Sequence, residues 1–256
     1  MIASLPVLHR LSPPAARTAL VLHGLEDVHT SWYPVARALG RGWSCVSAEL
    51  PWCAGNDYGW RWDASPGGWI ARVLARLDQS PDLVVAHSFA ANAVLELMAG
   101  DREPQIQAAL LLSPFFHRQT QRATWQTWDS ARAAFERQIR DGIAVRLRAG
   151  IRADDLELVV SRTLDRVGAD GFVAVFDEYL RSARLDLRLV VAPVAVVVGA
   201  EERARAGECA ALAAALPNAR LVVEPDQDHY LHLADPGRVA VLCHEISAWK
   251  GVSACS

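Results

Sequence analysis

Short, almost wholly apolar runs recur along the chain and alternate with helical patterns, which leaves few folds open to it. The runs occupy residues 19–22, 43–50, 83–87, 108–112, 194–198 and 220–223. Strands of a parallel sheet are covered on both faces, so they are apolar throughout instead of alternating with polar residues. Helix start signals, Ser65-Pro66 and Asp235-Pro236, lie between the runs. The sequence therefore predicts an α/β fold with a doubly wound, mostly parallel sheet.

One interval, residues 115–188, contains helical patterns but no convincing strand. It includes the tracts "ARAAFERQIRDGIAVRL" and "LELVVSRTLDRV" and is punctuated by Gly150 and Gly168. An interval of this length is too long for an ordinary loop. We therefore expect a helical cap formed by residues 115–188, inserted into a core formed by residues 1–114 and 189–256.

Composition narrows the class of protein. Hydrophobic residues make up 52% of the 256 residues and charged residues 21%, which is typical of a globular chain. The formal net charge is -3, and Lys250 is the only lysine. No compact basic run resembles a nucleic-acid footprint, so we expect no nucleic-acid partner. The N-terminus lacks the pattern of a signal peptide and no uncharged apolar stretch reaches about 18 residues, so we expect a cytoplasmic protein with no membrane partner.

The five cysteines are scattered, with no C-x-x-C spacing and no paired histidines at metal spacing. Neither a disulfide framework nor a zinc site is indicated by this pattern. We expect reduced thiols, mostly buried.

The segment "LVVAHSFAANAVLEL", residues 83–97, places Ser88 where a buried strand gives way to a helix. A sharp turn there lifts the hydroxyl above the carboxyl edge of the sheet, beside the N-terminus of the helix. Such a turn tolerates only small residues two before and two after the serine, and Ala86 and Ala90 occupy these places. Glycine is more usual there, and each alanine adds a methyl to a crowded turn. Ser88 is therefore a candidate nucleophile, with a helix-capping serine as the alternative.

A serine nucleophile needs a base and an acid that orients the base. Glu201 and Glu202 directly follow the run "PVAVVVG", and His229 lies in a loop after "ARLVVE", just before the last helix. The chain order serine, acid, histidine is the one expected on this architecture. His232 remains a second candidate for the base, and Glu201 remains a second candidate for the acid.

A further element lies upstream, where "LVLHGLEDVHTSW" puts His23-Gly24 at the end of the first clear strand. The backbone N–H groups of Leu25 and Phe89 are candidates for an oxyanion hole at this edge of the sheet. We interpret the ring of His23 as structural. His87 is interpreted in the same way, because neighbours along a strand point to opposite faces.

Taken together, these segments resemble the α/β-hydrolase superfamily over nearly the whole chain. The resemblance rests on the strand that ends in His-Gly, the "AHSFA" turn, the helical cap, the Gly-x-x-acid segment and the late histidine. It implies a serine hydrolase of the esterase or thioesterase type. By this resemblance Ser88 is the nucleophile, His229 the general base and Glu202, three residues after Gly199, the orienting acid.

The chain departs from the pattern of the family at four positions. Aspartate is more common where Glu202 stands, glycine is more common where Asp228 stands, and alanines flank the serine at positions 86 and 90. A glutamate can still serve, because the role requires a carboxylate near the imidazole and not a particular chain length.

We therefore expect a serine hydrolase that cleaves an ester or thioester of a mainly apolar acyl group through an acyl-enzyme intermediate. This chemistry requires no metal and no organic cofactor. Two alternatives stay open: an acyltransferase or cyclase that uses an acceptor other than water, and a catalytically degenerate hydrolase fold that acts as a binding protein. The sequence does not identify the acyl group, the leaving group or the oligomeric state.

Two features bear on the substrate. Trp52, Trp125 and Trp128 are candidates for the lining of an apolar pocket. Residues 115–152 contain eight arginines and three acidic residues. This bias fits an anionic, carrier-bound substrate or an ordinary solvated helix face. The expected partner is a small-molecule acyl ester or thioester, free or carrier-bound.

Overall fold

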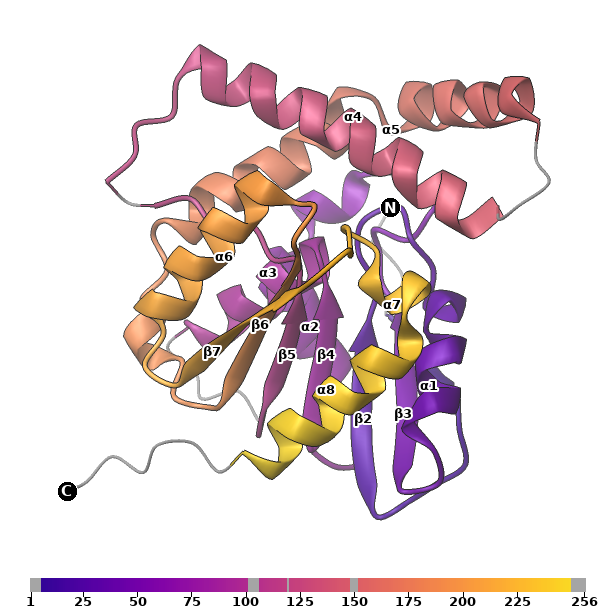
Figure 1. Cartoon of the computed structure of the whole chain (residues 1–256), viewed down its shortest axis with the longest axis vertical. Coiled ribbons are helices and arrows are strands. Elements are labelled where there is room, and N and C mark those ends of the chain that lie inside the picture. Colours follow the sequence, from indigo (N-terminus) through magenta and orange to yellow (C-terminus); the bar gives the residue numbers. More distant parts are fainter. Residues whose placement is uncertain (1–5, 101–105, 119, 148–151, 250–256) are drawn as a thin grey trace.

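A single seven-stranded sheet forms the centre of the molecule (Figure 1). The structure is a computed structural model that describes residues 6–100, 106–118, 120–147 and 152–249. The strand order is β1-β3-β2-β4-β5-β6-β7, and only the edge strand β1 runs antiparallel to its neighbour. The strands are β1 (Val7–Arg10), β2 (Arg17–Leu22), β3 (Trp43–Glu49), β4 (Leu83–His87), β5 (Ala109–Leu112), β6 (Val194–Gly199) and β7 (Ala219–Glu224). The predicted doubly wound, mostly parallel sheet is confirmed.

Helices connect the strands and begin where the sequence signals predict. The Ser65 hydroxyl accepts a hydrogen bond from the N–H of Gly68, and the Asp235 carboxylate accepts one from the N–H of Arg238. These N-caps satisfy backbone donors that the first helical turn leaves free. The helices of the core are α1 (Tyr33–Leu39), α2 (Pro66–Leu74), α3 (Phe89–Met98), α6 (Arg203–Ala215), α7 (Leu231–Ala234) and α8 (Pro236–Ala248), with 3₁₀ turns η1 (His29–Trp32), η2 (Gly59–Trp62) and η3 (Leu187–Leu189).

The five inner strands, β2 to β6, are mostly buried on both faces, which explains their continuous apolar runs, whereas the edge strands β1 and β7 are partly exposed. Successive residues of a strand point to opposite faces. In β2, Ala19 and Val21 pack in the layer that contains α1 and α8, whereas Leu20 and Leu22 pack in the layer that contains α2 and α3. The four cysteines within the described residues are free and buried, as expected, and Cys255 lies outside the described residues.

The order of the strands creates a crevice between β2 and β4. After β2 the chain adds β3 on one side, and it then returns to place β4 on the other side of β2. At such a switch point the loops after two adjacent parallel strands diverge, which leaves a crevice at their carboxyl ends. Leu22 lies opposite Ala86 in the register of β2 and β4. The segments that follow, with Leu25 and Ser88, therefore leave the sheet side by side.

Two long helices between β5 and β6 cover the carboxyl ends of the strands (Figure 1). They are α4 (Trp125–Leu147) and α5 (Ala153–Ser182), and Gly168, with a φ of 54°, interrupts the second of them. Gly142 allows α4 to approach the core closely, because a Cβ at this position would overlap the side chain of Tyr230. The Tyr230 hydroxyl donates a hydrogen bond of 2.6 Å to the carbonyl of Gln138.

No helix of the described residues combines the length and apolar character that a membrane span requires.

Glu178 of α5 is a buried carboxylic acid whose titration tests how α5 packs against the core. Its side chain is almost completely buried, and this burial, with a smaller contribution from the charge of Glu96, raises its pKa to about 8. Between the ordinary value of 4.5 and this raised value the folded chain keeps the proton while the unfolded chain loses it. The free energy of unfolding therefore falls as pH rises through this window.

We expect Glu178→Gln to raise the melting temperature at about pH 9 and to leave it nearly unchanged at about pH 4.5. The gain appears only at high pH because only there does the native chain carry a buried, ionised carboxylate. The control is Asp165→Asn, which removes an exposed carboxylate of the same helix. Thermal unfolding at both pH values measures the effect, and an equal shift at both would contradict the raised pKa.

Candidate active site

The turn at Ser88 has the strained backbone that the sequence predicts. Ser88 lies between β4 and α3 with a φ of 51° and a ψ of -115°, a region that non-glycine residues rarely adopt. Its N–H donates to the carbonyl of Leu112 at 2.8 Å, and its carbonyl accepts from the N–H of Asn92 at 3.2 Å. These bonds hold the turn, and Ala86 and Ala90 are accommodated with no exposed surface. Strain of this kind persists only where the surroundings fix it, and it is concentrated at functional sites.

Three side chains from distant segments meet above this turn. The Ser88 Oγ lies 3.0 Å from Nε2 of His229. Nδ1 of the same imidazole lies 2.7 Å from Oε2 of Glu202. Gly199 makes the approach possible, because a Cβ there would overlap the backbone of Gln227 in the histidine loop. The hydroxyl, imidazole and carboxylate form one chain of hydrogen bonds, the arrangement required to activate a serine.

The carboxylate of this chain is largely buried and well held. The Ser113 hydroxyl donates a hydrogen bond of 2.6 Å to Oε1 of Glu202, and the Arg205 guanidinium lies 3.9 Å from Oε2. Burial by itself would raise the pKa of Glu202, but His229, Arg205 and Ser113 together hold it below its ordinary value. Glu202 therefore stays ionised beside the imidazole at neutral pH. Glu201, the other candidate acid, is exposed and has no hydrogen bond to His229.

The sequence gives no indication that Ser113 contacts Glu202. Ser113 follows β5 directly and has a φ of 49°, so its backbone, like that of Ser88, turns sharply at the carboxyl edge of the sheet. The only available signal was the polar residue that ends the run "ALLLS". Serine after a strand is common, and nothing in the sequence specifies contact with residue 202.

The candidate oxyanion donors lie beside the nucleophile turn. A Cβ built on Gly24 would lie 3.4 Å from the Cβ of Ser88, so the loop after β2 runs directly past the serine. Within the described residues, neither the N–H of Leu25 nor that of Phe89 donates a hydrogen bond to another group. His23 anchors this loop, because its Nε2 accepts from the N–H of Leu50 at 3.1 Å and its carbonyl accepts from Trp52 Nε1 at 3.1 Å.

The other two histidines of the site have supporting contacts. Nε2 of His87 lies 2.9 Å from the carbonyl of His229 and so holds the backbone of the histidine loop. Burial, with the neighbouring His232 and His229, lowers the pKa of His87 well below its ordinary value, so the ring is neutral. His232 is fully buried, with its Nε2 3.4 Å from Oδ2 of Asp27. The structure thus places His229, and not His232, against Ser88.

Two ion pairs join the helices of the cap to the loop that contains Leu25. Arg146 of α4 donates to Oδ1 of Asp27 at 2.9 Å, and Arg166 of α5 pairs with Glu26. Both carboxylates are almost fully buried, at 3% exposure of their side chains. Burial alone would raise the pKa of Asp27, but His232 and Arg146 hold it well below its ordinary value. The two arginines therefore compensate charge that would otherwise be buried without a counterion.

We expect Arg146→Ala to lower the free energy of unfolding by about 3 kcal/mol, since removal of one partner leaves the buried Asp27 carboxylate without a cation. The matched control is Arg188→Ala, whose 88% exposed side chain pairs with Asp186 at the surface and should contribute less than about 1 kcal/mol. Urea denaturation of both variants measures the difference. Equal losses of unfolding free energy in the two variants would show that the buried ion pair stabilises the fold no more than the surface pair does.

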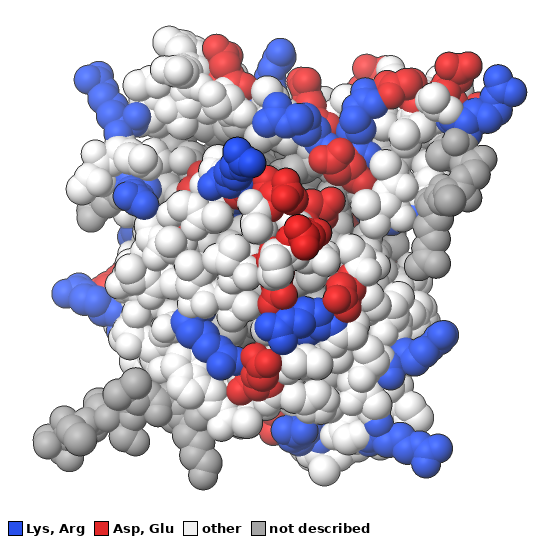
Figure 2. Space-filling model, in the orientation of Figure 1, with Lys and Arg blue, Asp and Glu red and all other residues white. Residues whose placement is uncertain are grey.

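A pocket with a volume of about 590 Å³ lies between the cap and the core, with His229 and Glu202 in its wall. Aromatic side chains form much of its surface, namely Phe115, Phe135, Phe172, Phe176 and Tyr179. Carboxylates also border it, among them Asp141, Glu201 and Asp228. On the face shown in Figure 2, acidic side chains gather below the cap and arginines are interspersed rather than joined into one basic surface.

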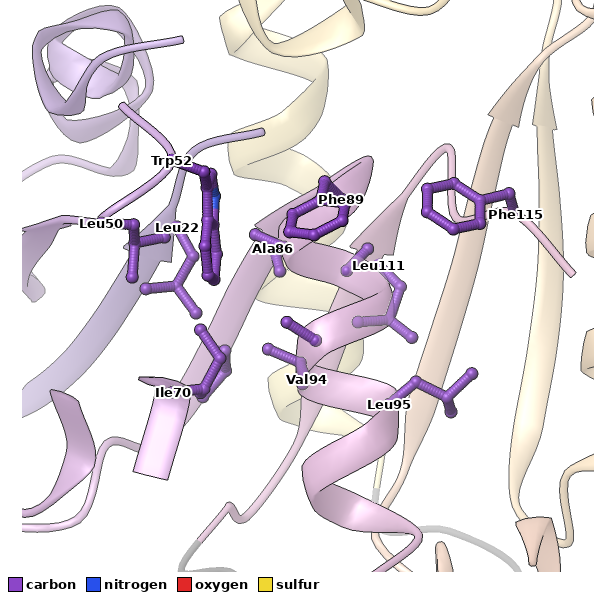
Figure 3. Close-up of a cluster of buried hydrophobic side chains, with 14 of the residues drawn as sticks. Leu22, Leu50, Trp52, Ile70, Ala86, Phe89, Val94, Leu95, Leu111 and Phe115 are labelled. Atoms are coloured by element: carbon purple, nitrogen blue, oxygen red, sulfur yellow. The ribbon is translucent and has the colours of Figure 1, made fainter. Parts of the chain in front are cut away.

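The three tryptophans proposed for the lining of an apolar pocket do not border this cavity. Trp52 is only 1% exposed and packs edge-on against Phe89, at 5.1 Å between ring centroids (Figure 3). Trp125 is 82% exposed and borders, with Trp128, a separate hollow at the start of α4. The ring of Trp128 stands behind the pocket wall, in edge contact with Phe172 and Phe176. The sequence marks these residues as apolar but does not say which side of a helix or loop faces the cavity.

Comparisons with known proteins agree with the fold. The model of a family described as the alpha/beta hydrolase family matches residues 19–242. No curated protein matches the chain in sequence. Similar solved structures include the esterase EaEST from Exiguobacterium antarcticum, with 10% identity, a TM-score of 0.68, and coverage of 95% of this chain and 96% of that one.

Two further structures are similar over the same extent. MenH from S. aureus has 11% identity and a TM-score of 0.63, with 95% of this chain and 97% of that chain covered. Est816, described as an N-acyl homoserine lactone degrading enzyme, has 18% identity and a TM-score of 0.67, with 94% and 96% covered. At these identities the likeness establishes a common fold.

Proposed function

The chain belongs to the alpha/beta hydrolase family, and we propose that it is a serine hydrolase that cleaves an ester or thioester of a mainly apolar acyl group. The family and its esterase-like neighbours support a hydrolase in general. One observation carries the more specific proposal: the continuous chain from Ser88 Oγ through His229 to Glu202, with distances of 3.0 Å and 2.7 Å.

The proposed reaction begins with proton transfer. Nε2 of His229 takes the proton of Ser88 as Oγ forms a bond to the acyl carbon, while the Glu202 carboxylate holds Nδ1–H and stabilises the imidazolium. The N–H groups of Leu25 and Phe89 receive the oxyanion, a contact whose loss typically costs about 10²- to 10³-fold in rate. His229 then returns the proton to the leaving alcohol or thiol as its bond to the acyl carbon breaks.

Hydrolysis of the acyl-enzyme repeats these steps with water. His229 takes a proton from the water as its oxygen attacks the acyl carbon, and it then returns the proton to Ser88 Oγ when the acid is released. No step requires a metal or an organic cofactor. The proton balance closes because each turnover consumes one water and leaves the serine and imidazole in their starting forms.

The pocket supports an apolar acyl group. Its aromatic wall and its volume of about 590 Å³ favour a chain or ring of moderate size, and each buried methylene contributes about 0.8 kcal/mol. Such a pocket distinguishes neighbouring chain lengths only weakly, by about 1–3 kcal/mol per methylene. We therefore propose a preference for a range of acyl lengths. A carrier-bound substrate remains part of this proposal.

The test is a panel of matched oxygen esters and thioesters of increasing acyl length, assayed with the full chain. We expect kcat/KM to rise with acyl length and then fall once the pocket is filled. Mass spectrometry of the products, with and without added alcohols and amines, separates hydrolysis from acyl transfer or cyclisation. If no ester or thioester of the panel is turned over but one of them still raises the melting temperature, the result would favour a binding protein instead.

A further inference from the structure

We propose that His9, His29 and Glu49 form a binding site for a divalent transition-metal ion such as Zn²⁺, separate from the chain of residues around Ser88. The three residues come from β1, from η1 and from the end of β3. Nε2 of His9 lies 3.3 Å from Oε2 of Glu49, and Nδ1 of His29 lies 3.6 Å from the same oxygen. Two imidazoles and one carboxylate thus lie together at the edge of the sheet, with their ligand atoms within 4.8 Å of one another.

The spacing of these atoms suits a small metal ion. In a tetrahedral zinc site the ligand atoms lie about 2.0–2.2 Å from the ion, which places them about 3.3 Å from one another. The distances of 3.3 Å and 3.6 Å from the two imidazole nitrogens to Glu49 are close to this value. Imidazole and carboxylate together suit Zn²⁺, Co²⁺ and Ni²⁺ better than they suit Ca²⁺ or Mg²⁺, which prefer oxygen ligands.

His29 carries an unsatisfied ligand atom. Its Nδ1 is shielded from water and makes no hydrogen bond in the described part of the chain. A bound ion would give this nitrogen a partner, because an imidazole nitrogen is a common ligand of transition-metal ions.

The site is also accessible. The side chains of His9, His29 and Glu49 are 31%, 20% and 40% exposed, so an ion can enter and a water molecule can complete its coordination. The two imidazole rings are stacked and nearly parallel, with centroids 3.7 Å apart. Each ring must turn out of this stack to point its lone pair at one ion. The χ2 angle of histidine is soft, and partial exposure leaves room for the rotation.

A second group of similar composition is less suitable. Asp27, His87 and His232 also lie close together, but all three are buried. Both oxygens of Asp27 already have partners, Arg146 on one side and His232 on the other. The group at Glu49 has no such competing cation within the described residues. The sequence does not reveal it, because its ligands lie far apart along the chain.

The bound ion would join segments that hold the loop beside Ser88. His29 follows the loop that contains Leu25, and Glu49 directly precedes Leu50, whose N–H bonds to His23. Because the ion binds the folded arrangement, it stabilises that arrangement. At a metal concentration about 100 times the dissociation constant, a chain of this size should gain roughly 5 °C or more in melting temperature.

The experiment uses the full chain after treatment with a chelator. Titration with Zn²⁺ by calorimetry and with Co²⁺ by visible absorption should give one ion per chain, with nitrogen and oxygen ligands and a dissociation constant in the micromolar range. Glu49→Gln and His29→Asn should each weaken binding at least tenfold and abolish the rise in melting temperature. The control is His244→Asn, which removes an exposed histidine of α8 and should leave binding unchanged.

Two results would overturn the proposal: no saturable binding up to millimolar Zn²⁺, or equal affinity in the native chain and the Glu49 and His29 variants. Circular dichroism verifies that each variant is folded, and the near-isosteric Glu49→Gln variant gives a test even if His29→Asn does not fold. Neither readout depends on turnover, so the outcome is independent of whether Ser88 is a nucleophile.

Discussion

Replacement of Ser88 by alanine is expected to lower kcat for an activated acyl ester by about 10⁶-fold, to the level of catalysis that an oxyanion hole and substrate binding alone provide. The loss is this large because no other hydroxyl among the described residues lies at hydrogen-bond distance from His229 Nε2. Without the hydroxyl the proposed acyl-enzyme cannot form, and the imidazole could act only on water. Steady-state assays with a fluorogenic ester measure the effect.

Ser113→Ala is the matched control for this result. Ser113 is also a serine with a positive φ at the carboxyl edge of the sheet, but its hydroxyl donates to Glu202 and not to His229. Its loss removes one hydrogen bond to a charged group, so we expect a decrease in kcat of about tenfold. Comparable losses in the two variants would mean that position 88 has no special role.

We expect replacement of Glu202 by glutamine to lower kcat by about 10⁴-fold, the effect of removing the orienting carboxylate from a serine triad. The amide preserves the size of the side chain but cannot stabilise the imidazolium of His229. The lowered pKa of Glu202 also makes its contribution to the free energy of unfolding depend on pH. This contribution is fully present above the ordinary pKa of a glutamate and is lost as pH falls through the lowered value.

Glu201→Gln provides the comparison. Glu201 is next to Glu202 in sequence and is exposed, and among the described residues the imidazole is hydrogen-bonded to Glu202 and Ser88 and not to Glu201. The account predicts that kcat in this variant stays within about twofold of the native value, as expected for a surface charge at high dielectric. If Glu201→Gln were the more damaging change, the assignment of the acid would be wrong.

Much of the fold follows from local pattern. The apolar runs specify buried parallel strands, and the capping residues Ser65 and Asp235 mark where helices begin. Parallel strands end at one edge of a sheet, so polar residues that follow them are brought together by the topology alone. For this reason Ser88, Glu202 and His229 could be proposed together from the sequence, although Ser88 lies more than one hundred positions before the other two.

Other features depend on tertiary contacts that no local pattern encodes. Arg146 and Arg166 lie in ordinary amphipathic helices, and only the packing of the cap shows that they neutralise Asp27 and Glu26. The position of Trp52 depends in the same way on packing, since a buried aromatic in a core and one in a pocket wall have the same sequence signal. His9, His29 and Glu49 converge only because β1 pairs with β3.

Covalent trapping of the nucleophile tests the central claim most directly. The full chain is treated with a fluorophosphonate, and the adduct is located by mass spectrometry of the intact protein and its peptides. We expect one adduct per chain, on Ser88, which does not form in the Ser88→Ala variant and forms much more slowly in a His229→Gln variant. An unmodified Ser88 in the folded chain, or an adduct at another residue, would contradict it.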